Sequence, residues 1–316
     1  MISRRTIRIK VLQTLYTYYS TPERSINNSE KELFFSLGKT FDLYHLIFQL
    51  VIELADFAQH RIDTNMGKLR PSYEDLHPNL RFVNNRVIKM LRENRRLKAY
   101  INQSKISWSN HPELIKDLYQ FLAESDFYAE YLSRPSDSFG EDKRLIDRIL
   151  NNIILISEDV HLMLEEDSIY WNDDLDIVIA MISKTIKGFR PDSDENQPLL
   201  PMFKDEDDKQ FAKDLFRKTI LNNDELRSIV DQHASNWDIE RIAFMDILIM
   251  ELALAEFLYF PSIPTKVTLN EYIEMAKFYS TEKSRTFING ILDKALKELK
   301  LDNKIEKAGR GLIGEA

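Results

Sequence analysis

Glycine is unusually scarce in this chain, at 8 of 316 residues, which is about 2.5% against a typical value of about 7%. Because glycine supplies the positive φ angles of tight hairpin turns, few such turns can form. The sequence therefore disfavours an all-β or doubly wound α/β fold. Hydrophobic residues make up 43% of the chain, enough for a substantial core, and the length allows two domains or one domain with a large insertion.

Cysteine is absent from the chain, which excludes disulfide bonds, thiolate metal sites and a cysteine nucleophile. The N-terminus has neither a continuous apolar run nor a small-residue cleavage site, so it does not resemble a signal peptide. The most apolar stretch, residues 242–260, is interrupted by Asp246, Glu251 and Glu256, whose carboxylates are costly inside a bilayer. We therefore expect a cytoplasmic protein without a membrane helix.

Charge is unevenly distributed along the sequence. The net charge of −8 argues against non-specific coating of nucleic acid. The first 20 residues nevertheless contain Arg4, Arg5, Arg8 and Lys10 and no acidic residue. This N-terminal segment is therefore a candidate local site for an anionic partner.

Apolar residues recur at helical spacing along most of the chain. In the first segment Ile7, Val11 and Leu15 share one stripe, and Ser3 is placed to cap the helix. Further helices are expected at residues 33–62, 80–100, 113–133, 143–164, 173–186 and 282–300. The pattern predicts an all-α fold.

Two helices near the C-terminus have distinctive features. Residues 242–260, which follow Trp237 and Asp238, are apolar on nearly all sides, as is typical of the central helix of a bundle. Thr268 and Glu271 have the spacing of a capping box at the start of the next helix. Gly290, inside the last helix, costs about 1 kcal/mol relative to alanine and suggests close helix packing.

Two segments interrupt the helical pattern. Residues 191–209 combine prolines with many acidic residues, and we interpret them as an acidic linker. Residues 303–316 are expected to be a flexible tail. Gly309, Gly311 and Gly314 there match the spacing of a dinucleotide-binding fingerprint, but they follow a helix, whereas the fingerprint needs a preceding strand.

Seven basic residues gather between residues 80 and 100. They are Arg81, Arg86, Lys89, Arg92, Arg95, Arg96 and Lys98. A solvated cationic helix face is the simpler interpretation, and a phosphate-binding face is the alternative.

Recognisable catalytic motifs are missing from the sequence. The six histidines show no metal-ligand spacing, and there is no phosphate-binding loop or nucleophile elbow. We therefore expect no metal, no cofactor and no catalytic residue, and we predict that the protein is not an enzyme.

Two segments of the chain, RRTIRIKVLQTLY at residues 4–16 and the stretch from IPTKVTLNE to FINGILD at residues 263–293, resemble the NusB transcription antitermination family, a bacterial all-helical family. Residues 4–8 (RRTIR) and 12–16 (LQTLY) resemble the arginine-rich opening and the Q-x-L-Y motif of its first helix. Residues 263–271 (IPTKVTLNE), 276–277 (AK) and 287–293 (FINGILD) reproduce the family's C-terminal motifs in order. The motif positions include Pro264, Lys266, Asn270, Glu271, Asn289 and Gly290.

The resemblance implies a NusB-like two-lobed helical bundle with an additional helical insertion. Residues 1–22 and 205–302 would form the NusB-like domain, and residues 23–190 the insertion, whose length departs from compact family members. Residues 191–209 would be the linker and 303–316 the tail. A further departure is Glu251, because many members have an arginine there.

The resemblance also implies a function. The family pairs with the ribosomal protein NusE on single-stranded boxA RNA and promotes antitermination of ribosomal RNA transcription by RNA polymerase. Residue by residue, it implies phosphate contacts from three arginines, base stacking by an aromatic ring, a base contact from a carboxylate, and further contacts from the last helix. These residues are Arg4, Arg5, Arg8, Tyr16, Asp246, Lys283, Thr286 and Phe287.

Several alternatives remain open at this stage. Core packing is the alternative for Tyr16 and Phe287, and capping or interhelix hydrogen bonds are the simpler roles for Asn270, Glu271 and Asn289. For the whole chain, the alternative is a helical protein–protein scaffold whose NusB-like part no longer binds RNA. A methyltransferase carrying a NusB-like domain is disfavoured, because the chain lacks the glycine-rich nucleotide loop on a parallel sheet.

Overall fold

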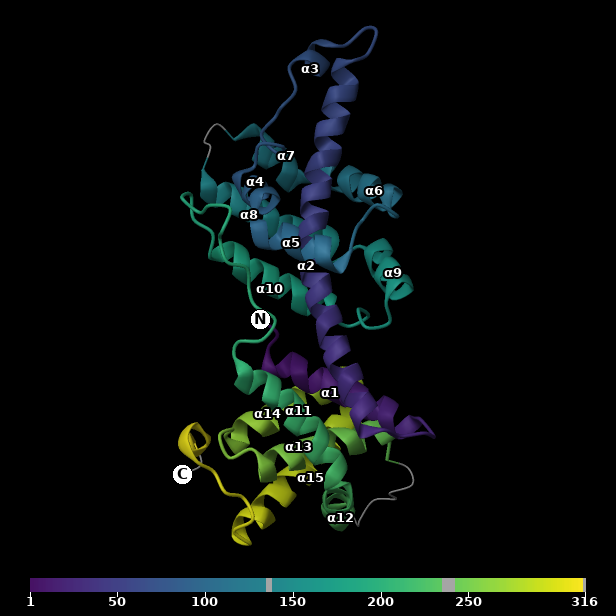
Figure 1. Cartoon of the computed structure of the whole chain (residues 1–316), viewed down its shortest axis with the longest axis vertical. Helices are drawn as coiled ribbons and strands as arrows, with labels where there is room; N and C mark the ends of the chain where they lie inside the picture. The colour runs from purple at the N-terminus through teal and green to yellow at the C-terminus, as the bar shows by residue number, and fades with distance from the viewer. Residues whose placement is uncertain (135–137, 235–241, 315–316) are drawn as a thin grey trace. The chain divides into compact units, whose positions relative to one another are not determined.

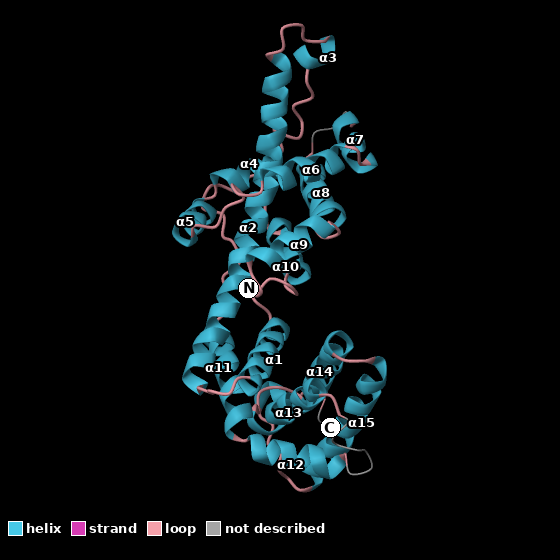
Figure 2. Ribbon diagram, turned by 90° about the vertical axis from the view of Figure 1, so that its right-hand side faces the viewer, coloured by secondary structure: helices cyan, strands magenta, loops and turns pink. Residues whose placement is uncertain are grey.

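The computed structural model describes residues 1–134, 138–234 and 242–314, which form helices joined by loops and contain no β-strand (Figures 1 and 2). The prediction of an all-α fold is confirmed. The chain divides into two compact units. Unit 1 comprises Met1 and Gly38–Met202, and unit 2 comprises Ile2–Leu37 and Phe203–Ala316.

Unit 2 is built around one buried helix. Its helices are α1 (Arg4–Ser20), the first part of α2 (Ile26–Met66), α11 (Glu206–Leu221), α12 (Asn223–His233), α13 (Phe244–Tyr259), α14 (Thr265–Tyr279) and α15 (Glu282–Leu301). Helix α13 packs against α1, α11, α12, α14 and α15, which confirms the expected central helix. Trp237 and Asp238 lie outside the described residues.

Helix α1 has the apolar stripe that the sequence predicts, but it is less amphipathic than expected, because Arg8 and Lys10 are buried as well. The Ser3 side chain accepts a hydrogen bond from the Thr6 amide at 3.1 Å and so caps the helix. Ile7, Val11 and Leu15 are fully buried, and α1 packs against α11 and α13. Its apolar stripe therefore holds the first residues of the chain against helices that come more than 180 residues later.

The start of α14 differs from the prediction. The helix begins at Thr265, with Pro264 at the N-cap position, so Thr268 and Glu271 lie inside it and form no capping box. The Thr268 hydroxyl instead donates to Glu256, and Glu271 accepts from Arg5. Both side chains that the local pattern predicts to form a cap therefore make tertiary contacts instead.

Part of the predicted acidic linker is helical. Three acidic residues, Glu206 to Asp208, form the first turn of α11, and Asp205 caps it by accepting from the Asp208 amide at 3.1 Å. Acidic residues stabilise a helix N-terminus because they face the positive end of its dipole. This explains why the charges gather there.

The segment predicted as a tail packs against the loop between α13 and α14. The Ala308 amide donates to the Pro261 carbonyl at 3.0 Å, and the Lys307 ammonium donates to the Phe260 carbonyl at 3.0 Å. Gly311 lies in the short helix η3 (Gly309–Leu312) and is buried. A Cβ at Gly311 would lie 1.9 Å from the Pro261 carbonyl oxygen, so only glycine fits there.

Unit 1 surrounds the remainder of α2 with short helices. They are α3 (Tyr73–Leu76), α4 (Arg86–Glu93), α5 (Arg95–Ser104), α6 (Pro112–Ala123), α7 (Asp126–Ser133), α8 (Phe139–Ile149), η1 (Leu150–Ile154), α9 (Glu158–Asp167) and α10 (Leu175–Lys187). The indole N–H groups of Trp108 and Trp171 donate to the α2 carbonyls of Leu46 and Lys39, at 2.7 and 2.8 Å. These bonds tie distant loops to α2.

Three of the helices expected from periodicity are broken in the structure. Residues 80–100 contain α4 and α5, which meet at Asn94, and residues 113–133 contain α6 and α7, which meet near Ser125. Residues 143–164 contain α8, η1 and α9, and α9 starts after Ser157. Asn94 and Ser157 each accept an amide hydrogen bond as an N-cap, which allows the chain to turn without losing the apolar period.

Candidate nucleic-acid interface

The first two arginines of α1 are partly exposed and paired with carboxylates of unit 2. Arg4 donates to Asp208 at 2.8 Å, and its guanidinium lies 5.0 Å from the centre of the Phe211 ring. Arg5 donates to both carboxylate oxygens of Glu271, at 2.8 and 2.9 Å, and this bond raises the pKa of Arg5. The side chains remain 38% and 54% exposed, so both can reach a ligand.

Arg8 is buried, unlike the phosphate-binding residue expected from the resemblance. It donates to both oxygens of Glu256 at 2.7 Å, and Thr268 and Tyr272 also donate to that carboxylate, at 2.7 and 3.2 Å. Burial alone lowers the pKa of Arg8, but the Glu256 carboxylate more than offsets this and raises it above its ordinary value. Because the buried carboxylate of α13 uses the guanidinium, Arg8 holds α1 in place.

An aromatic cluster lies where the second half of α1 meets the start of α13. The ring of Phe244 is 5.8 Å from that of Tyr16 and 6.2 Å from that of Tyr19, measured between centroids. Tyr16 is 44% exposed and Phe244 is 41% exposed. Tyr16 is therefore partly exposed and in contact with a second ring, so it is neither a core residue nor a free side chain.

Hydrogen bonds bring the starts of α13 and α15 together beside α1. Ser280, which directly precedes the Thr281 N-cap of α15, donates to Asp246 in the first turn of α13. Gln13 of α1 donates to the Tyr279 hydroxyl at the end of α14, at 3.2 Å. Asp246 is almost fully buried, so its carboxylate positions Ser280 and is not exposed for contact with a base.

The start of α15 contains the other predicted RNA-contacting residues. Thr281 caps the helix by accepting from the Ser284 amide at 3.1 Å. Lys283 and Thr286 are exposed, whereas Phe287 is half-buried. The structure therefore brings together Tyr16, Asp246 and the start of α15 through Phe244 and Ser280. The local sequence does not mark these two linking residues, because Phe244 gains its role from its contact with Tyr16 of α1, and Ser280 gains its role from its hydrogen bond to Asp246.

Comparison with known proteins identifies the C-terminal half of the chain. A family model described as the NusB family matches residues 175–297. The transcription antitermination protein NusB of Salinibacter ruber is 41% identical over 128 residues, which cover 39% of this chain and 80% of that protein. The chain belongs to the NusB family.

Further relatives agree with this assignment. The transcription antitermination protein NusB of Chloroherpeton thalassium is 42% identical over 105 residues, covering 33% of this chain and 50% of that protein. That of Desulfatibacillum aliphaticivorans is 39% identical over 98 residues, covering 31% and 68%. No solved structure matches the chain.

The residues matched by the NusB family model do not coincide with either compact unit. The match includes α10, which lies in unit 1, and omits α1, which packs within unit 2. A sequence comparison finds contiguous stretches, whereas α1 is separated from its packing partners by the whole of unit 1. Helix α1 carries Arg4, Arg5 and Tyr16, so much of the candidate interface lies outside the NusB-family match.

The NusB-like motif residues of α14 and α15 have mainly structural or exposed positions. Pro264 precedes α14 and Glu271 pairs with Arg5, whereas Lys266, Asn270 and Asn289 are exposed. Gly290 is also exposed, and a Cβ there would meet nothing within 4 Å. The expectation of close helix packing at Gly290 is therefore wrong.

Glu251 is a buried carboxyl of α13. It accepts a hydrogen bond from the Asn223 side chain at 2.9 Å. Burial raises the pKa of Glu251 to about 7, although the charge of Arg227 and the bond from Asn223 oppose this shift. A glutamate is accommodated at this position because its carboxylate has a hydrogen-bond donor and because its raised pKa lets it bind a proton below about pH 7.

Half of the six basic residues of α4 and α5 are paired within unit 1. Arg86 pairs with Asp142 at 2.7 Å, and Arg92 and Arg95 pair with Asp56 and Glu195. These pairs leave less free positive charge than the sequence suggests. They favour the solvated helix face over the phosphate-binding face.

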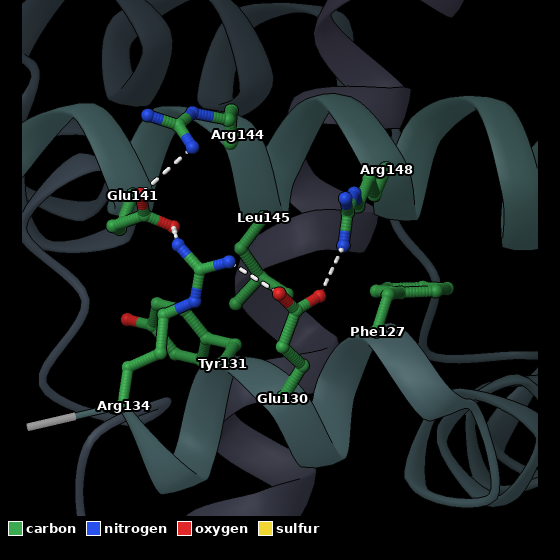
Figure 3. Close-up of a pocket in the computed structure, with 8 residues that line it drawn as sticks. All are labelled: Phe127, Glu130, Tyr131, Arg134, Glu141, Arg144, Leu145 and Arg148. Carbon is green, nitrogen blue, oxygen red and sulfur yellow. Dashed lines mark hydrogen bonds and ion pairs between the residues drawn. The ribbon is translucent and has the colours of Figure 1, made fainter.

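A pocket between α7 and α8 also concentrates charge (Figure 3). Arg134 lies between Glu130 and Glu141, to which it donates, and Arg148 donates to Glu130 at 3.1 Å. The bonds from Arg134 and Arg148 lower the pKa of Glu130. Since these charges are mutually satisfied, the network joins α7 to α8 and is a weak candidate for ligand binding.

Neither a metal-binding cluster nor a membrane span is present in the described part of the chain. No group of three or more histidine, aspartate or glutamate side chains there is arranged to hold a metal ion. None of the described helices is both long and apolar enough to cross a membrane.

Proposed function

We propose that this protein is a non-enzymatic transcription antitermination factor that acts in the cytoplasm. It binds single-stranded boxA RNA together with the ribosomal protein NusE, as part of the RNA polymerase antitermination complex, and promotes processive transcription of ribosomal RNA. Membership of the NusB family and the names of its relatives support the antitermination role.

The observation that carries the RNA-binding proposal is the pair of partly exposed rings, Tyr16 and Phe244, beside the starts of α13 and α15. Single-stranded RNA is commonly held by stacking of bases on aromatic rings and by charge on phosphates. Helix N-termini favour phosphate because of their free amides and positive dipole ends. Lys283 adds an exposed ammonium near the start of α15.

The two exposed arginines extend this surface along α1. Tyr16 lies 11 residues after Arg5, which is about 16 Å along a helix, a distance that several nucleotides of an extended strand can span. A phosphate near Arg5 must compete with Glu271, its present partner. We therefore assign phosphate contacts to Arg4, Arg5 and Lys283, stacking to Tyr16 and Phe244, and positioning roles to Arg8 and Asp246.

The test is a fluorescence anisotropy titration of a short boxA RNA and a scrambled control, with and without NusE, at two salt concentrations. We expect boxA to bind more tightly than the control, and the difference to grow when NusE is added. Equal and weak binding of both RNAs in the presence of NusE would overturn the proposal and favour a protein–protein scaffold.

Two single-residue variants test which side chains form the RNA-binding surface. Tyr16→Ala should weaken boxA binding by about 1–3 kcal/mol, the usual loss of one stacked base.

Lys283→Ala should reduce the slope of RNA affinity against salt concentration by about one, as expected when one phosphate contact is lost. The matched control is Lys294→Ala, an exposed lysine on the same face of α15 about three turns further on. Equal effects of the two lysine variants would contradict the assignment.

A further inference from the structure

Unit 1 contains an open groove that the proposed RNA surface does not use. It lies between α6 and α9, which are neighbours in Figure 1. Two hollows, of about 480 and 280 Å³, share Leu114, Asp117 and Asp159 in their walls. They therefore form one continuous groove along both helices.

The groove has an apolar floor that is open to solvent. Phe121 is 50% exposed, Ile156 is 59% exposed and Leu162 is 57% exposed, whereas Leu118 and Met163 below them are buried in the core of unit 1. Leu114, Leu118 and Phe121 recur at the spacing of one helix face. Large apolar side chains that gather in an open groove mark an interaction site, whereas isolated ones do not.

The rim of the groove is acidic. Five carboxylates line its walls, and no lysine or arginine does; the five are Glu113, Asp117, Glu158, Asp159 and Glu166. Only Glu113 among them is held in an ion pair with a neighbouring cation, Lys116, at 2.8 Å. The His111 ring, 3.0 Å from Asp167, links the start of α6 to the end of α9 at one end of the groove.

We propose that this groove binds a cationic amphipathic helix of a partner protein. A helix with leucine, isoleucine or phenylalanine at positions i, i+4 and i+7 places its stripe on the apolar floor, and flanking lysines or arginines face the carboxylate rim. This is the common helix-in-groove mode of recognition. The floor residues of α6, Leu114 and Phe121, are seven positions apart, about 10 Å along the helix, which matches two turns of such a helix.

The acidic charge of the rim distinguishes between the possible occupants of the groove. An acidic rim repels RNA and anionic lipid surfaces, and attracts a basic segment. A second copy of the chain carries a net charge of −8, so its overall field opposes docking here. The inference does not depend on boxA binding, because the groove lies wholly in unit 1.

The test uses the full chain and two synthetic helical peptides with the same leucine stripe. One peptide has lysine at its remaining positions, and the other has glutamate. Fluorescence anisotropy should show salt-dependent binding of the lysine peptide and no binding of the glutamate peptide. Hydrogen exchange should show protection of α6 and α9 on binding.

Two groove variants and one control locate the binding site. Asp117→Lys combined with Asp159→Lys should weaken binding of the lysine peptide by at least about tenfold, because two attractive charges become repulsive. Leu162→Ser should weaken it by removing an apolar contact from the floor without changing the charge of the groove. Glu165→Lys makes the same kind of charge change on α9 outside the groove lining, and should have a much smaller effect. Circular dichroism checks that each variant remains folded.

Three outcomes would overturn the proposal. The first is failure of the lysine peptide to bind in the micromolar range, or equal binding of both peptides. The second is binding that the groove variants and Glu165→Lys reduce equally. The third is self-association of the chain, measured by sedimentation, that Leu162→Ser abolishes, because this would assign the groove to a second copy.

Discussion

Arg8 has a different role in the structure from the one that the sequence suggests. In the sequence, Arg8 is one of four basic residues near the N-terminus. In the structure its guanidinium and the Glu256 carboxylate are both buried and make two hydrogen bonds to each other. The sequence hint was a glutamate, Glu256, in a helix that is apolar on nearly all sides, because such a charge needs a buried partner.

We predict that Arg8→Met destabilises unit 2 by about 3–5 kcal/mol, because it leaves the Glu256 carboxylate buried without its counter-charge. Arg5→Met removes an exposed pair and should cost no more than about 1 kcal/mol. The measurement is hydrogen exchange of peptides covering α13 at increasing urea concentration. Adding Glu256→Gln to Arg8→Met should recover part of the loss, and equal effects of the two single variants would contradict the structural role of Arg8.

Glu251 gives unit 2 a specific pH dependence. The pKa of its carboxyl is about 7 in the folded chain and 4.5 when unperturbed, so between these values the folded state retains a proton that the unfolded chain has released. Raising the pH through this window therefore lowers the free energy of unfolding, by at most about 3 kcal/mol.

The variant Glu251→Gln should remove this part of the pH dependence. We expect the difference in unfolding free energy between wild type and variant to change between pH 5 and pH 8, with the wild type losing stability relative to the variant. Urea unfolding at a series of pH values measures it. A difference that stays constant over this range would show that Glu251 does not titrate there.

At the scale of elements, the helices follow from apolar periodicity, whereas their ends depend on contacts that periodicity does not record. Asn94 and Ser157 divide two long periodic stretches because their side chains cap new helices. Pro264 starts α14 before the Thr268 and Glu271 pair that had suggested a capping box. The start of α1 follows from the sequence, because its cap, Ser3, is adjacent to the helix.

Gly290 provides a test at the level of one helix. It is exposed inside α15, and a Cβ there would meet nothing within 4 Å. Gly290→Ala should therefore stabilise α15 by about 0.5–1 kcal/mol, because alanine restricts the unfolded chain and favours the helix. Thermal unfolding measures the change. Destabilisation would instead indicate close packing against the glycine.

At the scale of the whole molecule, each unit has a hydrophobic core of its own. The core of unit 1 draws on residues between Leu43 and Leu199, and unit 2 is organised around α13. Helix α2 belongs to both, with residues 26–37 in unit 2 and 38–66 in unit 1. The predicted limits of the NusB-like domain, insertion and linker remain a prediction to be tested with fragments.

We predict that the two units fold separately. The rings of Phe34 and Phe203 lie 6.4 Å apart, which places the two ends of the chain of unit 2 in the same region, so a glycine linker can replace residues 38–202. Circular dichroism and hydrogen exchange should show this shortened chain and an isolated 38–202 fragment to be helical and cooperatively folded. Loss of protection in α13 of the shortened chain would show that unit 2 needs unit 1.

The sequence by itself determined the all-α class, the buried α13 and the NusB-family motifs, because glycine scarcity, apolar period and motif order are properties of contiguous residues. Only the tertiary structure decided which charged and aromatic residues are available to bind a partner. Arg8 and Asp246 are engaged in buried contacts, whereas Arg5, Tyr16 and Phe244 are partly open. The same residue type stabilises a core or meets a partner according to its neighbours across the fold, and those neighbours are brought together only by packing.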